Sequence, residues 1–328
     1  MRAFVTGGTG FIGANLVAGL NARGIKAIIL RRESSSLLAL DGLAYDSIVG
    51  DILDSPLQLA EAMDGCDWVF HVAAVSDYWR QGTDWVYKVN VEGTKNILVA
   101  ARAAQVQRFV FTSSLAAMGI PKRGQLLDES STFNLRPDQM PYGHSKHLAE
   151  IEVRREVERG LEAIIVNPSI VLGPRDLNLI SGSIIIEAAN GLARVYPPGG
   201  VNYVSVEDVV TGHISAAEKG CTGERYILAG ENLTHKRALQ IVCEVVGRKP
   251  PIIELPKWTL PAIATSIAAA RKLFGNKIPF DENQVLASGE FIFADGSKAI
   301  HSFNLPQSSF RSAVQKAYDW YNNNGYLA

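Results

Sequence analysis

Tyr142 and Lys146 place a phenol and an ammonium group four residues apart, with Gly143, His144 and Ser145 between them. In a helix, side chains at this spacing lie one turn apart on the same face. A phenol has an unperturbed pKa of about 10. A neighbouring positive charge favours the phenolate and brings its proton within working range for acid–base chemistry. The same pair is common on ordinary exposed helix faces, so its meaning depends on the rest of the chain.

Two further features indicate that the pair belongs to an oxidoreductase site. Ser113 and Ser114 follow the apolar, strand-like run 109–112, and Ser114 precedes Tyr142 by 28 residues. The chain also opens with a glycine-rich loop of the kind that holds phosphate groups. A serine pair that simply ends a strand is the alternative interpretation of residues 113–114.

The glycine-rich loop, Thr6 to Gly13, lies between the first strand-like run and the first helix-like run. Gly7 permits a tight turn, Gly10 lets the backbone approach a pyrophosphate, and Gly13 lets the helix pack closely on the strand. The helix start then presents free N–H groups and a positive dipole end to the phosphates. This strand–loop–helix context predicts a dinucleotide-binding site rather than an isolated turn.

The end of the second strand indicates which dinucleotide binds. NAD-binding chains usually carry an acidic residue there, whereas this chain has Arg31 and Arg32. Guanidinium groups suit a 2′-phosphate, which a carboxylate would repel. We therefore expect NADP(H) in preference to NAD, although Glu33 lies close and two arginines can also form a solvated edge. Residues 50–52 (Gly-Asp-Ile), after the third strand, are placed to meet the adenine.

Apolar runs and helix-like segments alternate through the first half of the chain, which predicts an α/β fold with a Rossmann-type doubly wound parallel sheet. The continuous apolar runs are typical of strands covered on both faces. They are residues 2–6, 27–30, 68–72, 109–112 and 164–166. Helical spacing is found over 11–22 and about 83–105.

The alternation weakens after about residue 174, where proline-punctuated shorter segments begin. We expect residues 1–174 plus about 201–230 to form the dinucleotide-binding domain. A smaller, discontinuous substrate-binding domain would comprise about 175–200 plus 231–328. Because ligands of such open sheets bind outside the carboxyl ends of the strands, the second domain would close over that crevice and set substrate choice.

Composition narrows the class of protein. The 328 residues are 47% apolar and 20% charged, which is ordinary for a globular protein that buries a sizeable core. A net charge of −1 gives no reason to expect nucleic acid or an anionic membrane as a partner. Three cysteines without a Cys-x-x-Cys pair favour reduced thiols and a cytoplasmic protein.

Neither a membrane span nor a metal site is expected. Residues 2–6 already form a core strand, which argues against a signal peptide. The uncharged segment from Trp258 to Ala270 is too short to cross a bilayer, and we expect a buried or lid helix, with a partner or membrane-surface contact as the minor alternative. His144 and His147 have helical spacing but no third ligand, so we interpret them as surface helix residues.

In their order along the chain, these motifs resemble the extended short-chain dehydrogenase/reductase family. The motifs that carry the resemblance are Thr6-Gly7-x-x-Gly10-x-x-Gly13, Gly50-Asp51, His71-Val-Ala-Ala74, Asn90-Val-x-Gly-Thr94, Thr112-Ser-Ser114, Tyr142-x-x-x-Lys146, Asn167-Pro-Ser169, Gly173-Pro174, Val204-Ser-Val-Glu-Asp208 and Asp295-Gly-Ser-Lys298. Within the family the chain is most similar to the dihydroflavonol reductase-like group, whose bacterial members include proteins labelled hopanoid-associated sugar epimerases. Asp77-Tyr-Trp79, Asn90 to Thr94 and Tyr226 to Thr234 carry that closer likeness.

The resemblance implies a role for each catalytic candidate. Tyr142 would give a proton to the substrate carbonyl oxygen as hydride arrives from the nicotinamide, and Lys146 would lower the Tyr142 pKa and hold the nicotinamide ribose. Ser114 would hydrogen-bond the same oxygen. It is preferred over Ser113 because it lies five residues before Gly119, the usual family spacing. Asn90 would support the site through its helix, unless it is only a polar contact inside that helix.

The resemblance also implies the binding residues. The expected cofactor contacts are Gly7, Thr9, Gly10, Phe11, Ile12, Gly13, Arg31, Arg32, Asp51, Ile52, Val72, Ala73, Ala74, Thr112, Tyr142, Lys146, Pro168 and Ser169, the last two against the nicotinamide carboxamide. The expected substrate contacts are Ser76, Tyr78, Ser114 and Tyr142. Residues 77–79 form either a substrate wall or an ordinary loop cluster.

Three functions remain open. The leading hypothesis is an NADP(H)-dependent reductase or dehydrogenase acting on a small to medium ketone or aldehyde. A nucleotide-sugar epimerase is the alternative; it needs cations for the diphosphate, for which Arg175, Arg194, Lys236 and Arg237 are available without a clear pair. A non-catalytic NADP-binding sensor is a minor alternative, since both Tyr142 and Lys146 are present. A 4,6-dehydratase is disfavoured because Leu115 and Ala116 stand where that subfamily has Asp-Glu. The resemblance also makes a homodimer plausible.

Overall fold

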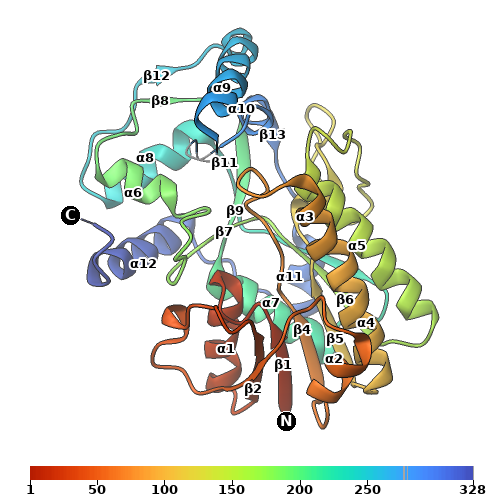
Figure 1. Ribbon diagram of the computed structural model, residues 1–328. Coiled ribbons are helices and arrows are strands. Elements are labelled where there is room, and N and C mark those ends of the chain that lie inside the picture. The colour runs from red at the N-terminus through yellow and green to blue at the C-terminus, as the bar shows by residue number, and fades with distance from the viewer. Residues whose placement is uncertain (276–277, 279, 328) are drawn as a thin grey trace.

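A seven-stranded parallel sheet forms the centre of the protein (Figure 1). The computed structural model describes residues 1–275, 278 and 280–327. The strand order is β10-β6-β5-β4-β1-β2-β3. The strands are β1 (Arg2–Thr6), β2 (Lys26–Arg31), β3 (Asp46–Val49), β4 (Trp68–His71), β5 (Arg108–Thr112), β6 (Ala163–Pro168) and β10 (Arg225–Leu228). The predicted doubly wound sheet is thereby confirmed.

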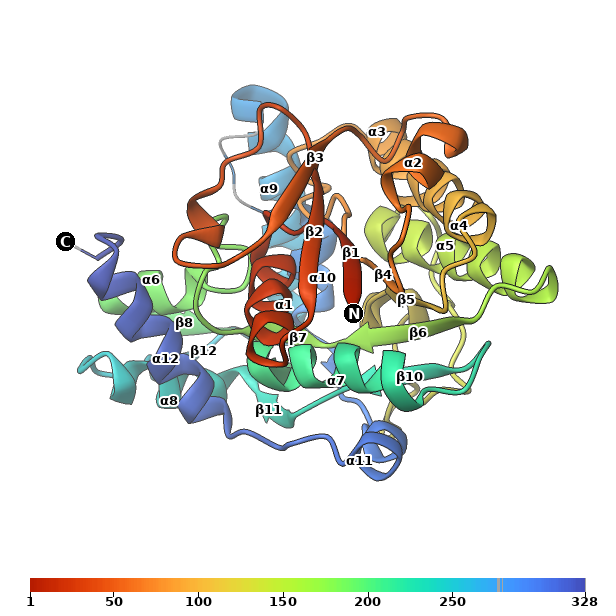
Figure 2. The same cartoon turned by 90° about the horizontal axis from the view of Figure 1, so that it is seen from below.

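Helices cover both faces of this sheet, as Figure 2 shows from below. One face packs against α1 (Phe11–Ala22) and α7 (Val206–Lys219), and the other against α2 (Pro56–Ala62), α4 (Thr94–Ala103) and α5 (Pro141–Glu158). Side chains alternate along a strand. Ala3 and Val5 therefore pack in the apolar core under α1 and α7, while Phe4 packs in the core on the opposite face, under α2, α4 and α5. Both faces are therefore apolar, which explains why these strands are continuous hydrophobic runs in the sequence.

Helix α5 carries Tyr142 and approaches the end of β5 closely. Pro141 occupies its first position, where the missing N–H costs no hydrogen bond. A Cβ on Gly143 would lie 2.5 Å from the carbonyl oxygen of Ala116, in the short 3₁₀ helix η3 (Leu115–Met118). Only glycine allows this approach, which brings the first turn of α5 next to the segment after β5.

A segment with an unusual turn precedes α4. The short α3 (Thr83–Tyr87) continues into a π-helical turn, η2 (Lys88–Gly93), which runs directly into α4. Such turns are rare and often lie at functional sites. This one contains Asn90, which is buried.

A smaller sheet lies beyond the carboxyl ends of the large one (Figure 1). Its central strand β9 (Gly200–Ser205) pairs in parallel with β7 (Ile170–Leu172) and β13 (Phe291–Ile292), and antiparallel with β11 (Glu231–Thr234). A separate pair joins β8 (Val195–Tyr196) to β12 (Ile253–Glu254). The helices of this region are α6 (Ser183–Ala189), α8 (His235–Val245), α9 (Leu260–Phe274), α10 (Glu282–Ala287) and α12 (Phe310–Asn323), while α11 (Ser297–Phe303) packs on α7 and β10.

The small sheet draws strands from both of the residue ranges assigned above to the two domains, so that division stays a proposal.

Helices α6, α8 and α12 share one apolar cluster around Tyr321 with β7 and β9. In the part of the chain that the structure describes, no helix is both long and apolar enough to cross a bilayer.

Candidate active site

The candidate site lies where the strand order reverses. The chain runs outward from β1 through β2 to β3, then returns to place β4 on the other side of β1. Thr6, the last residue of β1, pairs with His71, the last residue of β4. The segments that follow β1, β4, β5 and β6 therefore leave the sheet at one edge, which is the position where open α/β sheets bind ligands.

The glycine loop after β1 fits a dinucleotide. Gly7 has φ +69°, and a Cβ there would lie 2.6 Å from the amide nitrogen of Ala73. A Cβ on Gly13 would lie 2.1 Å from the carbonyl oxygen of Gly7. The backbone of the loop is thus packed against the end of β4 without side chains, and α1 begins at Phe11 with Gly10 as a cap that supplies no side-chain hydrogen bond. The first N–H groups of α1 are left to bind an anion.

Buried hydrogen bonds connect the strand ends on which this loop lies. His71 lies between two threonine hydroxyls, with 2.7 Å from Nδ1 to Thr6 Oγ1 and 2.9 Å from Nε2 to Thr94 Oγ1. Thr94 donates onward to the carbonyl oxygen of Asn90, so His71 carries its proton on Nε2 and accepts at Nδ1. Burial, reinforced by the Lys146 charge, lowers the pKa of His71 to about 3. The ring is therefore a neutral structural connection between β1, β4 and α4.

The residues expected at the adenine end lie along the ends of β2 and β3. Arg31 is half-buried and its Nε donates to Ser47 Oγ at 3.2 Å, whereas Arg32 and Glu33 are exposed. The Asp51 carboxylate accepts from the amide of Leu53 at 3.0 Å and shapes the turn after β3. Ile52 is buried, as an apolar contact for a base would require.

The two serines after β5 face different surroundings. Ser113 is buried and donates to Glu150 Oε1 at 2.6 Å. Ser114 is half-buried, accepts from the amide of Ala116 at 3.1 Å, and its side chain also forms a hydrogen bond with Tyr142. The structure thus brings Ser114, and not Ser113, to the phenol.

Lys146 is almost fully buried one turn after Tyr142. Its Nζ donates to the carbonyl oxygen of Thr112 at 2.7 Å and lies 4.7 Å from the centre of the Phe111 ring. Burial lowers the pKa of Lys146 to about 7, while the Glu150 carboxylate acts in the opposite direction. The Lys146 amine is therefore held at the end of β5 in surroundings that lower its pKa toward neutrality.

The predicted effect of this ammonium on the phenol pKa is not found. Burial raises the pKa of Tyr142 above its ordinary value, and the hydrogen bond with Ser114 is the opposing influence. The prediction considered only helical spacing, which could not show that both groups are withdrawn from water. Desolvation disfavours the charged form of each, so it raises the pKa of Tyr142, lowers that of Lys146 and moves the two values apart.

Asn90 supports the site without reaching its reactive groups. Its Oδ1 accepts from the amide of Val75 at 2.8 Å, and its Nδ2 donates to the Val75 carbonyl and to Ser145 Oγ, both at 3.0 Å. Ser145 in turn donates to the carbonyl oxygen of Tyr142 at 2.7 Å. Asn90 therefore fixes the segment after β4 relative to the first turn of α5.

The end of β6 presents a hydroxyl without a partner. Pro168 is buried, and Ser169 Oγ is enclosed yet forms no hydrogen bond with any described residue. A buried hydroxyl without a partner costs about 1–3 kcal/mol, which a bound group can recover. The carboxamide of a nicotinamide offers both a donor and an acceptor, so this observation fits the expected cofactor.

The expected substrate residues lie on the segment after β4. Ser76 is half-buried, and the Tyr78 hydroxyl donates to Asp281 Oδ1, the cap of α10, at 3.3 Å. The Trp79 ring is buried with its indole N–H unpaired in the described chain, and Arg271 of α9 donates to its carbonyl oxygen. Residues 76–79 are thus held against the α9–α10 hairpin.

The remaining expected cofactor residues follow the same edge of the sheet. Val72 and Ala73 are half-buried, Ala74 is exposed, and the amide of Ala73 donates to Thr6 Oγ1 at 3.2 Å. Thr112 is buried, and its hydroxyl pairs with His213 Nε2 at 2.8 Å. Thr9, Phe11 and Ile12 lie at the start of α1, half-buried.

Three buried residues behind the site were given no role from the sequence, although Asn167 is part of a motif that carries the family resemblance. Glu150 accepts from Asn167 Nδ2 at 2.7 Å and from Arg225 Nη1 at 3.1 Å. Glu150 lies one turn after Lys146, so helical spacing alone could have signalled it, whereas Asn167 and Arg225 come from distant strands.

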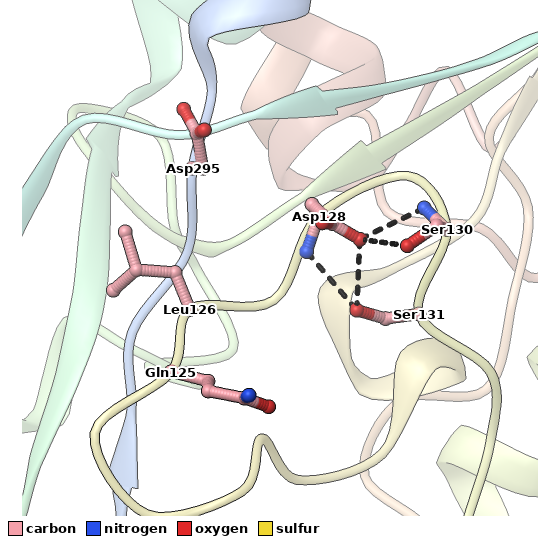
Figure 3. A pocket seen from close by; sticks show the side chains of 6 residues that line it. All are labelled: Gln125, Leu126, Asp128, Ser130, Ser131 and Asp295. Carbon is pink, nitrogen blue, oxygen red and sulfur yellow. Dashed lines mark hydrogen bonds between the residues drawn. The ribbon is translucent and has the colours of Figure 1, made fainter.

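The pocket described next lies outside the candidate site, and no metal-binding cluster is found among the described residues. The pocket in Figure 3 is a polar hollow in the segment before α5, lined by Gln125, Leu126, Asp128, Ser130, Ser131 and Asp295. Its Asp128 carboxylate already accepts from Ser130 and Ser131. Within the described residues, no group of three or more His, Cys, Asp or Glu side chains is arranged to hold a metal ion.

His144 and His147, interpreted above as surface helix residues, are half-buried, because α5 packs against two neighbouring aromatic side chains. Both rings lie against Phe133, and His144 also contacts the Tyr87 hydroxyl at 2.8 Å.

Comparison with known proteins agrees with this geometry. The profile of the family described as NAD dependent epimerase/dehydratase matches residues 3–229. The chain is 36% identical to a putative dihydroflavonol 4-reductase of Synechocystis sp. over 99% of this chain and 95% of that protein. It is 33% identical to sterol demethylase protein B of Methylococcus capsulatus over the full length of both. The crystal structure of gox2253 superposes with a TM-score of 0.87 at 35% identity, covering 100% of this chain and 99% of that one.

Proposed function

Because the chain belongs to the NAD dependent epimerase/dehydratase family, we propose that it is an NADP(H)-dependent reductase or dehydrogenase of a small to medium ketone or aldehyde. The observation that carries the proposal is the meeting of Ser114 and Tyr142 at the end of β5, with Lys146 buried one turn further along α5. A relative that matches 99% of this chain is named a putative dihydroflavonol 4-reductase, which supports the same class of reaction.

The chain's own residues perform the proton chemistry of this reaction. A bound nicotinamide supplies the hydride to the carbonyl carbon, or takes it up in the reverse direction. Tyr142 gives its phenolic proton to the carbonyl oxygen, and Ser114 donates a hydrogen bond to that oxygen as charge develops on it. Lys146, as an ammonium ion one turn further along α5, would hold the nicotinamide ribose.

The fit to the cofactor rests on three places in the structure. The glycine loop and the start of α1 take the pyrophosphate, Ser169 Oγ takes the carboxamide, and Arg31 with Arg32 take a 2′-phosphate. The arginines are the reason to propose NADP(H) rather than NAD, since their guanidinium groups pair well with a phosphate dianion.

The substrate is expected to be partly apolar. Tyr78 and the buried Trp79 lie on the segment that follows β4, and the Trp79 indole N–H has no hydrogen-bond partner among the described residues. Such a mixture of aromatic surface and few polar groups is typical of sites for small organic molecules. The names of the two relatives above refer to a dihydroflavonol and a sterol, which agrees with a substrate that carries apolar rings.

A nucleotide-sugar epimerase is the alternative, because the family's name includes epimerases. It needs cations that hold a sugar-linked diphosphate. Arg175 donates to the carbonyl oxygens of Ala39 and Asp41, which draws it toward the segment after β2. Arg194, Lys236 and Arg237 are exposed. This distribution favours the reductase.

One assay separates the functions. Purified protein is incubated with NADPH and a panel of ketones and aldehydes, and absorbance at the reduced nicotinamide band is followed. Consumption of NADPH that depends on a carbonyl compound supports the proposal. Isomerised nucleotide sugar without net cofactor change would instead identify an epimerase, and tight NADPH binding without either reaction would identify a sensor.

A further inference from the structure

Glu150 is a buried carboxylate at the back of the candidate site. It lies on α5 one turn after Lys146 and is 2% exposed. Its Oε1 accepts from Ser113 Oγ at 2.6 Å and from Asn167 Nδ2 at 2.7 Å, and its Oε2 accepts from Arg225 Nη1 at 3.1 Å. A buried carboxylate is costly unless it is paired and hydrogen-bonded, and these three donors meet that requirement.

The donors to Glu150 come from β6, from β10 and from the segment that follows β5. Ser113 immediately precedes Ser114 after β5, and Asn167 lies near the end of β6, where its Nδ2 also donates to the Ser114 carbonyl at 3.0 Å. Arg225 of β10 also donates to the carbonyl oxygens of Glu129 and Ser131. One carboxylate therefore ties the first half of α5 to the strand end that carries Ser114.

Among the groups found to act on the Lys146 charge, Glu150 is the one of opposite sign. The Nζ contacts the Thr112 carbonyl and the Phe111 ring, both uncharged, and the neighbouring His71 is held neutral. Glu150 is the group that raises the Lys146 pKa against burial. The titratable groups that face Glu150 itself are Arg225, the more distant Arg154 at 3.8 Å, and His147, whose pKa Glu150 raises against burial.

We propose that Glu150 is a positioning residue, which keeps Lys146 as an ammonium ion one turn from Tyr142 and fixes the end of β5 that presents Ser114. This inference rests on the proposed reductase function. Glu150 touches neither substrate nor cofactor and acts through Lys146 and Ser113.

The test is the pH profile of kcat/KM for Glu150→Gln. Glutamine keeps the shape and still accepts from Ser113, but it removes the negative charge, so Lys146 loses its proton at lower pH. We expect the alkaline limb of the profile to move down by about one pH unit or more. The loss of activity is then about tenfold or greater at pH 8 and only a few-fold at pH 6.

Glu156→Gln is the matched control. Glu156 also lies on α5, is buried, and pairs with Arg102 and Arg159, but it is not among the groups that shift the pKa of Lys146. This variant should keep the wild-type pH profile. If Glu150→Gln is poorly folded by circular dichroism, Glu150→Gln/Arg225→Gln removes both charges of the pair and should show an alkaline shift in the same direction but smaller, because loss of a nearby cation partly offsets loss of the carboxylate.

NADPH binding, followed by its fluorescence, gives a readout besides turnover. Since a protonated Lys146 is expected to hold the nicotinamide ribose, Glu150→Gln should weaken NADPH binding more at pH 8 than at pH 6. A wild-type protein that neither binds NADPH nor reduces carbonyl compounds would overturn the proposed function. An active wild type whose pH profile superposes on that of Glu150→Gln would overturn the role of Glu150 alone.

Discussion

Ser113 and Ser114 are adjacent in the chain, yet their hydroxyl groups point to opposite sides of the backbone at the end of β5 and contact different partners. Ser113 Oγ points inward and donates to Glu150 at 2.6 Å, while the Ser114 side chain meets the Tyr142 phenol. Alternation of side chains along extended backbone accounts for this division, because Ser114 has φ −159° and ψ 154°. One serine is thus part of the interior, and the other is available to a substrate.

The division predicts different phenotypes for two alanine variants. Ser114→Ala removes a donor to the developing oxyanion and should lower kcat by about 100-fold or more, with little change in unfolding free energy. Ser113→Ala should lower kcat by less than about tenfold but destabilise the fold by about 1–3 kcal/mol, because Glu150 loses a buried donor. Steady-state kinetics and urea unfolding of both variants measure the two effects. Equal losses of kcat would show that the serines do not divide these roles.

Tyr142→Phe should retain the fold and bind NADPH within a few-fold of the wild type. Its kcat should fall by two or more orders of magnitude, because the only change is the loss of the proton that Tyr142 gives to the carbonyl oxygen. Steady-state kinetics should therefore show the loss of kcat, while a fluorescence titration shows that NADPH still binds. Near-normal turnover would remove Tyr142 from this role.

Local patterns in the sequence predicted the large sheet and the glycine loop, because both depend on residues close in the chain. Continuous apolar runs specify strands buried on both faces, and Gly7 and Gly13 sit where a Cβ would strike backbone atoms. The contacts of Glu150 were not predictable in this way. Its partner Arg225 is 75 residues away, and only the fold shows that the two meet.

The same limitation explains the wrong prediction for the phenol. Helical spacing showed that Tyr142 and Lys146 lie one turn apart, but it carried no information on how far each is removed from water. Burial proved to be the largest influence on the pKa of both groups.

Cofactor preference should depend on Arg31 and Arg32. The variant Arg31→Ala/Arg32→Ala should raise the KM for NADPH by about tenfold or more while leaving the KM for NADH nearly unchanged, since only NADPH carries the 2′-phosphate. Arg23→Ala is the control, because Arg23 is an exposed arginine at the end of α1 that pairs with Glu218. Equal changes for both cofactors in the double variant would contradict the proposed contact.

Acidification should destabilise the protein through buried histidines. Burial lowers the pKa of His71 to about 3 and of His213 to about 4, from an ordinary value of 6.5. Because the folded state favours the neutral rings, their stabilisation is present above pH 6.5 and is lost as pH falls from 6.5 toward 4. The loss at pH 5 should be on the order of 2 kcal/mol for each histidine, measured by urea unfolding at pH 7.5 and pH 5.

His71→Gln tests the source of this effect. Glutamine can hydrogen-bond both threonines but does not titrate, so the variant should lose less unfolding free energy between pH 7.5 and pH 5 than the wild type. An unchanged difference would assign the acid sensitivity to other groups.

The contact between Tyr78 and Asp281 should control how tightly the α9–α10 hairpin holds the segment after β4. The two side chains are 203 residues apart, and Asp281 also caps α10 by accepting from the amide of Gln284 at 2.9 Å. Tyr78→Phe removes the connection while keeping the aromatic surface. We expect the KM for the carbonyl substrate to rise several-fold with kcat nearly unchanged, because the reacting groups on α5 and β5 are not disturbed.

A double-mutant cycle isolates this contact from other effects of the substitutions. If Tyr78 and Asp281 act as a pair, Tyr78→Phe/Asp281→Asn should raise the KM no more than the larger single change, since each substitution breaks the same hydrogen bond. Tyr318→Phe, on α12, removes a phenol hydroxyl elsewhere and should leave both constants unaltered. Multiplicative effects of the two substitutions would mean that the hairpin and the segment after β4 influence substrate binding independently.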